Sequence, residues 1–273
     1  MFLAPRAIRG VEHVTDSTYA RTVSLGEYQG WLKVKQSKYK NALSVEISPS
    51  LTNVLQSVLA KLRDLFDLYA RPDVIDSHLA ESKRLAPLVC KRPGLRVLGA
   101  FDSFELAWRA VLGQQVSVTG ATTLAGRFAQ TFGEPACTPI NNLNLFTPTA
   151  SRIAALTPNK IAKLGLPYKR AATLHNLANL LTDEPTLLDP GRSISLATDR
   201  LIALQGIGPW TSSYIAMRAL RWPDAFLESD LGIKHALKES SPSKIRKIAE
   251  PWRPFRAYAA MHLWSDLSKG IRN

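Results

Sequence analysis

The chain has 273 residues, of which 45% are hydrophobic, so it is long enough to bury a full core and to form two or three subdomains. Its 35 lysines and arginines outweigh 22 aspartates and glutamates, and the net charge of +13 favours a polyanionic partner. Two isolated cysteines, Cys90 and Cys137, exclude a disulfide framework, a zinc centre and an iron–sulfur cluster, and they indicate a reducing, intracellular location. We find no run of 18 apolar residues and no secretory signal, so we expect neither a membrane partner nor export.

The first 80 residues predict a small α+β domain. Residues 18–47 alternate between polar and apolar side chains, with turns at Gly26 and Asn41, which is typical of a small antiparallel sheet. Residues 52–70 carry apolar side chains at helical spacing and predict one helix, which Arg71-Pro72 ends.

The chain after residue 80 predicts mostly helices. Residues 83–99 contain proline, glycine and basic residues, which favours a connecting segment. Asp102 and Glu105 have the spacing of a capping box at a helix start. Thr147-Pro148 and Thr157-Pro158 each place a capping residue before a proline, which predicts two short helices. Further helices are expected at 119–132, 169–181, 243–249 and 254 to about 268, with an irregular stretch at 133–146 and a loop at 183–193.

The most informative stretch runs from Asp199 to Leu237 and predicts a helix, a tight turn, a second helix, a loop and a third helix. The turn, Gly206-Ile207-Gly208-Pro209, cannot continue a helix, and its glycines lack a Cβ, so another backbone can approach it. The second helix begins there, and the amides of its first turn attract an anion such as a DNA phosphate. Ser229 is the expected N-cap of the third helix, which puts Asp230 in the first turn, facing the same opening.

The segment LQGIGPWTSSYIAMRALRWPDAFLESDLGIK resembles the helix-hairpin-helix DNA glycosylases, and within them the alkylation-repair branch of the 3-methyladenine-DNA glycosylase II type. A GIG turn alone also occurs in many DNA-binding proteins that do no chemistry. Here Trp210 also stands 20 positions before Asp230, close to the interval between the hairpin position and the catalytic aspartate of the family. FELAWRAVLGQQVSVTGA near residue 110 and PWRPFRAYAAMHLW near residue 258 match as well, so the similarity covers nearly the whole chain.

The resemblance implies a mainly α fold with an N-terminal α+β domain. The helical part would consist of two lobes that meet at a cleft, and it would contain the helix-hairpin-helix motif. We expect the N-terminal domain at residues 1–80 and the helical glycosylase domain at 81–273. One lobe would take about 102–222, and the other 81–101 with 223–273. The match starts abruptly at FLAPRAIRGVE, where related proteins usually have a further leading segment, so we expect a missing edge strand or a later start.

Asp230 is the predicted catalytic residue. An aspartate at a helix start is ordinarily only a cap, and its spacing from Trp210 within the family motif is what favours catalysis. Loss of a base builds positive charge on the sugar, which a nearby carboxylate stabilises. The branch that also cuts the DNA strand has a lysine at the position of Trp210. Tryptophan cannot form a Schiff base, so the resemblance implies a monofunctional enzyme.

Trp210, Tyr214 and Trp264 match positions that line the base pocket in the family. Aromatic faces attract electron-poor, cationic rings by about 0.5–2 kcal/mol each, which favours alkylated over normal bases. Aromatic residues at helical spacing are otherwise usually core residues, and for Tyr214 both interpretations stay open.

The resemblance also implies the DNA contacts, which are Gly206, Ile207, Gly208, Thr211 and Gln115. Gln115 matches the residue that fills the gap left by a flipped nucleotide. Some family members have leucine there, and a glutamine that simply ends a helix is an equal alternative. For Arg253 and Arg256 two roles stay open, which are contact with DNA and bracing of the last helix.

No cofactor for catalysis is implied, and no iron–sulfur cluster. A structural monovalent cation at the hairpin is implied, with the main-chain carbonyls of Ile202, Leu204 and Ile207 as its ligands.

Together these features predict a base-excision enzyme that flips a nucleotide out of double-stranded DNA and hydrolyses the N-glycosidic bond of alkylated bases, chiefly 3-methyladenine and 7-methylguanine. Two alternatives stay open. The same fold could act on uracil, hypoxanthine or oxidised guanine, or the chain could bind damaged DNA without catalysis. We expect a monomer, located in the cytoplasm or nucleoid of a bacterium or in the nucleus of a eukaryote.

Overall fold

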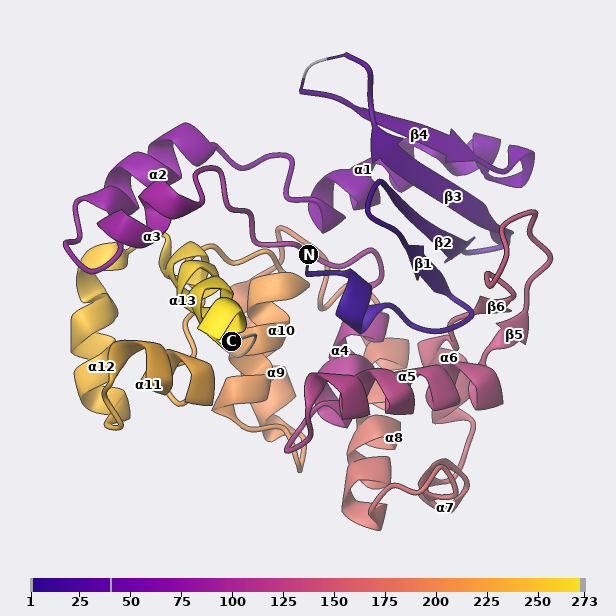
Figure 1. Ribbon diagram of the computed structural model, residues 1–273. Coiled ribbons are helices and arrows are strands. Elements are labelled where there is room, and N and C mark those ends of the chain that lie inside the picture. The colour runs from indigo at the N-terminus through magenta and orange to yellow at the C-terminus, as the bar shows by residue number, and fades with distance from the viewer. Residues whose placement is uncertain (1, 40, 271–273) are drawn as a thin grey trace. The chain divides into compact units, whose positions relative to one another are not determined.

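The computed structural model describes residues 2–39 and 41–270 (Figure 1). By contact, the chain divides into two compact units, one of residues 1–60 and 107–185 and the other of residues 61–106 and 186–273. These units cut across the expected domains at 1–80 and 81–273, whose boundaries stay a prediction. Within the described residues, no helix is both long and apolar enough to cross a bilayer.

The first unit contains the predicted antiparallel sheet. Its strands follow chain order as β1 (Glu12–Val14), β2 (Thr18–Leu25), β3 (Tyr28–Gln36) and β4 (Leu43–Ile47). Gly26 and Asn41 adopt positive φ angles of 61° and 59° between the last three strands, which confirms the predicted turns. β1 was not predicted, because three residues are too short to show an alternation.

Strand β2 is buried on both faces, so its one charged residue, Arg21, needs a partner inside the unit. Glu12 pairs with Arg21 across β1 and β2 and accepts hydrogen bonds from the Tyr19 hydroxyl (2.8 Å) and from Arg109 Nη1 (3.2 Å). Burial alone would raise the pKa of Glu12, but the Arg109 and Arg21 guanidinium groups hold it below its usual value. The carboxylate therefore stays ionised and ties the sheet to the helix that carries Arg109.

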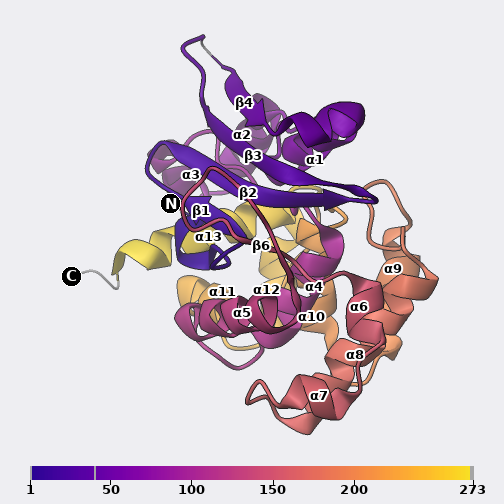
Figure 2. The same cartoon turned by 90° about the vertical axis from the view of Figure 1, so that its right-hand side faces the viewer.

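The helices of the first unit are α5 (Val118–Phe132), α6 (Ala150–Ala154), α7 (Pro158–Ala162) and α8 (Tyr168–Asp183), with a 3-10 turn, η1, at Ala4–Arg6 (Figure 2). Trp108 packs against Phe128 of α5 in the core of the unit, with ring centroids 4.7 Å apart and ring planes tilted by 30°. The Thr157 side chain caps α7 as predicted. Thr149, and not Thr147, caps α6, because its hydroxyl is the one that reaches the Arg152 amide.

Two other expectations for this part of the chain were wrong. The single helix over 52–70 is a 3-10 turn, η2 (Pro49–Val54), followed by a shorter helix α1 (Leu55–Leu65) that leads into the second unit. Residues 133–146 are not wholly irregular, since β5 (Glu134–Pro135) and β6 (Leu145–Phe146) form a two-stranded ribbon. Strands β5 and β6 have two residues each, which is too short for a periodic pattern to reveal them.

The second unit is helical. Helix α4 (Ser103–Leu112) connects the two units, and the Asp102 side chain caps it by accepting from the Glu105 amide (2.7 Å), as the capping box predicts. The other helices are α2 (Pro72–Ala80), α3 (Ala86–Lys91), α9 (Ile194–Ala203), α10 (Pro209–Arg218), α11 (Leu231–Leu237), α12 (Pro242–Ala249) and α13 (Arg256–Gly270), with a 3-10 turn, η3, at Glu250–Trp252.

Helices α2 and α3 correct the sequence analysis. Pro72 does not end the preceding helix. It occupies the first turn of α2, where its missing N–H costs no hydrogen bond. Residues 83–99 are not only a connection, because α3 lies within them and buries Val89. Its six residues are too few to show a helical period among the prolines and basic residues.

Helix α13 places a histidine inside the second unit. His262 is fully buried and lies near Asp76 of α2, near the Leu88 carbonyl of α3 and near Arg92, which follows α3. Burial lowers the pKa of His262 below its ordinary 6.5, and Arg92 adds to this, while Asp76 acts in the opposite direction. The ring is therefore neutral in the folded chain at neutral pH.

We expect the protein to lose stability as the pH falls below 6.5, because the unfolded chain then binds a proton that buried His262 resists. The stabilising contribution is complete above 6.5 and declines as the pH falls towards the lower pKa of the folded state. Urea unfolding at pH about 7.5 and about 5.5 measures the difference. His262→Leu should reduce it, whereas the same change at exposed His235 should not. An equal pH dependence in both variants would contradict the assignment.

Candidate active site

The predicted helix-hairpin-helix is formed by α9, the turn at 204–208 and α10, the orange helices of Figure 1. The Ile207 amide donates to the Leu204 carbonyl (3.1 Å), and the buried Ile207 side chain anchors the turn. Gly206 has a φ of 94°, which glycine alone adopts readily. Gly208 is different: its φ is ordinary, and a Cβ built there meets no atom of the described chain within 4 Å. The protein's own packing therefore does not require glycine at 208.

Helix α10 begins at the hairpin with two aromatic residues on one face. Trp210 and Tyr214 are one turn apart, and their rings stack almost in parallel, 5.3 Å between centroids and 5° between planes. Both side chains are partly exposed. A hydrogen bond joins this stack to Asp230, because Trp210 Nε1 donates to Asp230 Oδ2 at 3.0 Å.

Asp230 is itself the N-cap of α11, which corrects the expectation that Ser229 caps this helix. The residue has an extended backbone (φ −64°, ψ 131°), and its Oδ1 accepts from the Ile233 amide at 2.9 Å. Aspartate caps helices as well as serine does, so the sequence could not separate two adjacent candidates. The capping bond fixes one carboxylate oxygen at the helix start.

The Asp230 carboxylate has a third donor from α13. Trp264 Nε1 donates to Oδ1 at 2.8 Å, so two indole N–H groups and one backbone amide hold the two oxygens. Three N–H donors suit an ionised carboxylate, which only accepts hydrogen bonds. The side chain remains partly exposed. A fixed negative charge bordered by aromatic rings can stabilise a developing positive charge nearby.

The structure thus brings Asp230, Trp210, Tyr214 and Trp264 together within the second unit, while their roles stay predictions. Gln115 belongs to the first unit. It lies three residues beyond the end of α4, is exposed, and has a φ of 58°. Arg170 Nη2 donates to the neighbouring Gln114 carbonyl (2.9 Å), and Val116 and Val118 next to it are exposed. Gln115 therefore projects from a braced loop and does not belong to a helix.

Thr211, Arg253 and Arg256 lie outside this cluster of side chains. Thr211 is only 3% exposed, so a DNA contact there has to use its backbone. Arg256 makes two hydrogen bonds to the buried carboxylate of Asp224 (2.7 and 2.8 Å), and Arg253 approaches the same group (3.0 Å). These ion pairs brace the start of α13 and account for Arg253 and Arg256 without DNA.

The implied cation site has a donor set of backbone oxygens, as hard cations prefer. The Leu204 carbonyl already accepts from Ile207 within the turn, and a carbonyl oxygen has a second lone pair that can take a cation. Ile202 lies in the last turn of α9, where carbonyls are left without helical partners. The residues present are compatible with a cation. Among the described residues, no group of three or more His, Cys, Asp or Glu side chains could hold a metal.

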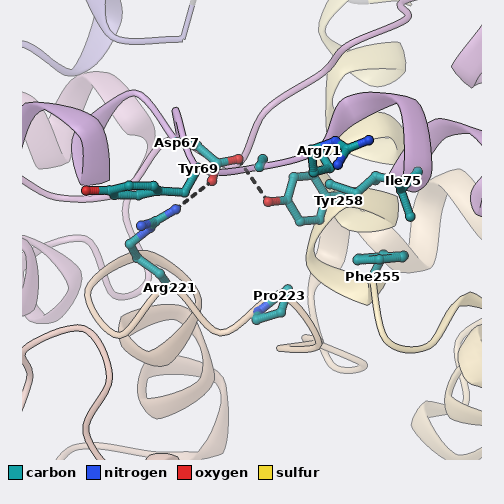
Figure 3. Close-up of a pocket in the computed structure, with 10 residues that line it drawn as sticks. Asp67, Tyr69, Arg71, Ile75, Arg221, Pro223, Phe255 and Tyr258 are labelled. Carbon is teal, nitrogen blue, oxygen red and sulfur yellow. Dashed lines mark hydrogen bonds and ion pairs between the residues drawn. The ribbon is translucent and has the colours of Figure 1, made fainter.

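A separate hollow of about 270 Å³ in the second unit contains none of the predicted site residues (Figure 3). Asp67 at its edge accepts from Arg221 Nη2 (3.0 Å), the Tyr258 hydroxyl (2.9 Å) and the Val97 amide (3.2 Å). Burial and the nearby Asp67 charge raise the pKa of Tyr258, so its hydroxyl stays protonated and donates. Asp67 is thus paired with Arg221 and Tyr258. The hollow therefore offers few free polar groups to a ligand from these three residues.

Comparison with known proteins identifies the family of the chain. Residues 1–102 match the model of the AlkA N-terminal domain, and residues 108–254 match that of the HhH-GPD superfamily base excision DNA repair proteins. DNA-3-methyladenine glycosylase 2 of Escherichia coli is 38% identical over 96% of this chain and 90% of its own length. The chain belongs to the HhH-GPD superfamily of base excision DNA repair proteins. The predicted family is confirmed.

Other relatives support the same fold. A probable bifunctional transcriptional activator/DNA repair enzyme AlkA of Mycobacterium tuberculosis is 36% identical over 98% of this chain, which spans 54% of that protein. The solved structure of a 3-methyladenine DNA-glycosylase from Archaeoglobus fulgidus has a TM-score of 0.80, with 21% identity over 97% of this chain and 91% of its own. The mainly helical HhH-GPD fold with an N-terminal sheet is therefore confirmed.

Gly232 of this HhH-GPD protein is not among the site residues predicted from the sequence. A Cβ built on Gly232 would lie 3.1 Å from Asp230 Oδ1, 3.1 Å from Trp264 Cδ1 and 3.3 Å from Trp264 Nε1. These distances are shorter than ordinary van der Waals contacts, so a side chain would push into the hydrogen bond between Trp264 and Asp230. No sequence signal marks the residue, because a glycine in the first turn of a short helix has many explanations.

We expect Gly232→Ala to displace the Trp264 indole while leaving the fold intact. Alanine favours the helix by up to about 1 kcal/mol, so the free energy of unfolding should stay the same or rise. The indole N–H resonances of the six tryptophans report the geometry by two-dimensional ¹⁵N–¹H NMR. The Trp264 resonance should move upfield as its hydrogen bond weakens.

Gly126→Ala is the matched control, because the added Cβ meets only Arg9 Cβ at 3.5 Å on an ordinary helix. It should leave all indole resonances in place. An unchanged Trp264 resonance in Gly232→Ala would show that the site accommodates a side chain there.

Proposed function

We propose that this chain is a monofunctional DNA glycosylase that releases alkylated purines, chiefly 3-methyladenine and 7-methylguanine, from double-stranded DNA. The observation that carries the proposal is the Asp230 carboxylate, held by the Trp210 and Trp264 indoles and bordered by the Trp210–Tyr214 stack at the start of the hairpin's second helix. The names of the relatives point to the same chemistry.

The proposed reaction uses few groups. As the bond between C1′ and the base nitrogen breaks, its electron pair leaves with the base, which neutralises an alkylated, cationic purine. The sugar becomes positively charged, and Asp230 stabilises that charge at a fixed position. Water then bonds to C1′ through its oxygen and releases a proton to the solvent, which leaves the neutral abasic sugar. A cationic purine leaves readily, so no general acid is needed.

The aromatic residues supply the selectivity in this proposal. The faces of Trp210, Tyr214 and Trp264 attract a cationic ring more than a neutral one, by about 0.5–2 kcal/mol for each contact. The position of Trp210 carries no amine, so no Schiff base forms and the strand stays uncut.

DNA binding in this proposal combines the hairpin with the net charge of +13. The bare backbone of Gly206, Ile207 and Gly208 lets a phosphate approach the start of α10, and a structural monovalent cation on the carbonyls of Ile202, Leu204 and Ile207 would join that contact. Gln115, projecting from its loop, fills the gap left by the flipped nucleotide. The protein acts as a monomer inside the cell.

We expect Asp230→Asn to lower the single-turnover rate constant of base release roughly 100-fold or more, because the transition state loses its negative partner. Asparagine caps helices as well as aspartate, so the Ile233 amide keeps its acceptor and the fold survives. The measurement is release of 3-methyladenine from methylated duplex DNA, with the strand analysed before and after alkali. The native protein should leave the strand intact until alkali is added.

Asp102→Asn is the matched control, since Asp102 caps α4 with the same geometry outside the site. It should retain the native rate. Base release at the native rate by Asp230→Asn would refute the mechanism. If the native protein binds DNA but frees no alkylated base, lesions such as uracil, hypoxanthine and oxidised guanine become the candidates, and then binding without catalysis.

A further inference from the structure

Arg218 continues the row of residues that starts with Trp210 and Tyr214. The three residues are spaced by four along α10, so they lie on one face of the helix. Arg218 is the last residue of the helix, and only 4% of it is exposed. A guanidinium buried this deeply needs hydrogen-bond acceptors within the protein.

The guanidinium joins the row to another segment of the second unit. Arg218 Nη1 donates to the Tyr214 hydroxyl (3.1 Å), Nη2 donates to the Gly99 carbonyl (3.3 Å), and Nε donates to the Leu98 carbonyl. Arginine presents these donors in a rigid, planar fork. The position of the Tyr214 hydroxyl is thereby tied to the backbone at 98–99.

The backbone at 98–99 is itself fixed. The Gly99 amide donates to the Leu65 carbonyl (2.9 Å), and a Cβ at Gly99 would lie 2.4 Å from the Asp64 carbonyl oxygen. The segment is packed against residues 64–65 with no room for a side chain. Arg218 therefore fixes the Tyr214 hydroxyl relative to a rigid part of the backbone.

The Tyr214 ring stacks on Trp210. The two rings are nearly parallel, so the tilt of the tyrosine determines the tilt of the indole. The indole in turn donates to Asp230 at 3.0 Å, and such a bond weakens steeply when its angle changes.

We propose that Arg218 is a positioning residue for the Asp230 carboxylate. It holds the Tyr214 hydroxyl, the stacked Tyr214 ring holds the Trp210 indole, and the indole holds one carboxylate oxygen. The kinetic part of this inference rests on the proposed glycosylase activity, whereas the geometric part does not.

The test is Arg218→Lys, which keeps the charge and the length but not the fork. We expect the single-turnover rate constant of base release to fall about tenfold, with the affinity for damaged DNA unchanged within about twofold, because a small misplacement of a reacting group slows the chemistry. The Trp210 indole N–H resonance should shift, and that of Trp264 should not. Arg246→Lys, at an exposed ion pair with Glu228, is the matched control and should change neither.

A double-mutant cycle separates positioning from general support of the fold. In a Trp210→Phe background no indole N–H remains at this position, so Arg218→Lys should cost less than about twofold. Tyr214→Phe keeps the stack and removes only the hydroxyl, so it should shift the Trp210 resonance even if Arg218→Lys fails to fold.

Two results would overturn the proposal: an equal rate loss in both backgrounds, or an unmoved Trp210 resonance in both single variants. If the native protein released no base, the proposed function would fail, and the indole resonances would still decide the positioning role.

Discussion

The hydrogen bonds around the Asp230 carboxylate are the interaction on which the candidate site depends. Its Oδ1 accepts from the Ile233 amide and the Trp264 indole, and its Oδ2 accepts from the Trp210 indole. The same group therefore starts helix α11 and ties α10 to α11 and α13. A side chain with one function could change its rotamer, but rotation here would break a helix cap and two indole bonds together. In the proposed reaction the charge is therefore fixed before the substrate arrives, so little reorganisation is needed.

Helix α10 holds that carboxylate from one side with a single row of residues. At its N-terminal end Gly206 permits the turn through its positive φ, and at its C-terminal end the buried Arg218 engages the carbonyls of residues 98–99. Between them the Trp210–Tyr214 stack has little freedom. Trp264 approaches from α13 on the other side, where Gly232 leaves space for it. The site thus depends as much on what packs behind the aromatic rings as on the rings themselves.

Much of this arrangement was predictable from the sequence, and the exceptions have physical reasons. Long elements with clear periodicity, such as β2, β3, α5 and α8, and the hairpin at 204–208, were found because each carries several consistent signals. Helix α3 and strand β1 were missed because they are too short to show a period, and α2 was missed because Pro72, which begins it, was interpreted as the end of the preceding helix. The cap of α11 was assigned one residue early, since Ser229 and Asp230 are equally good caps and only the fold decides which residue is extended. Arg218 lies at the visible four-residue spacing, but its acceptors at 98–99 are distant in sequence. Gly232 is important only because of where Trp264 packs.

A chain with a net charge of +13 attracts DNA, but the same field disfavours a cationic base relative to a neutral one. Selection for alkylated purines therefore needs a local reversal of sign. Asp230 supplies a full negative charge, and the rings of Trp210, Tyr214 and Trp264 supply the negative faces of their π systems. At physiological salt the field of distant surface charges is screened beyond about 8 Å, whereas contacts inside the site are screened much less. In the proposed function, a net positive charge that attracts DNA can therefore coexist with a site that favours a cationic base, and the contacts inside the site would decide which base is released.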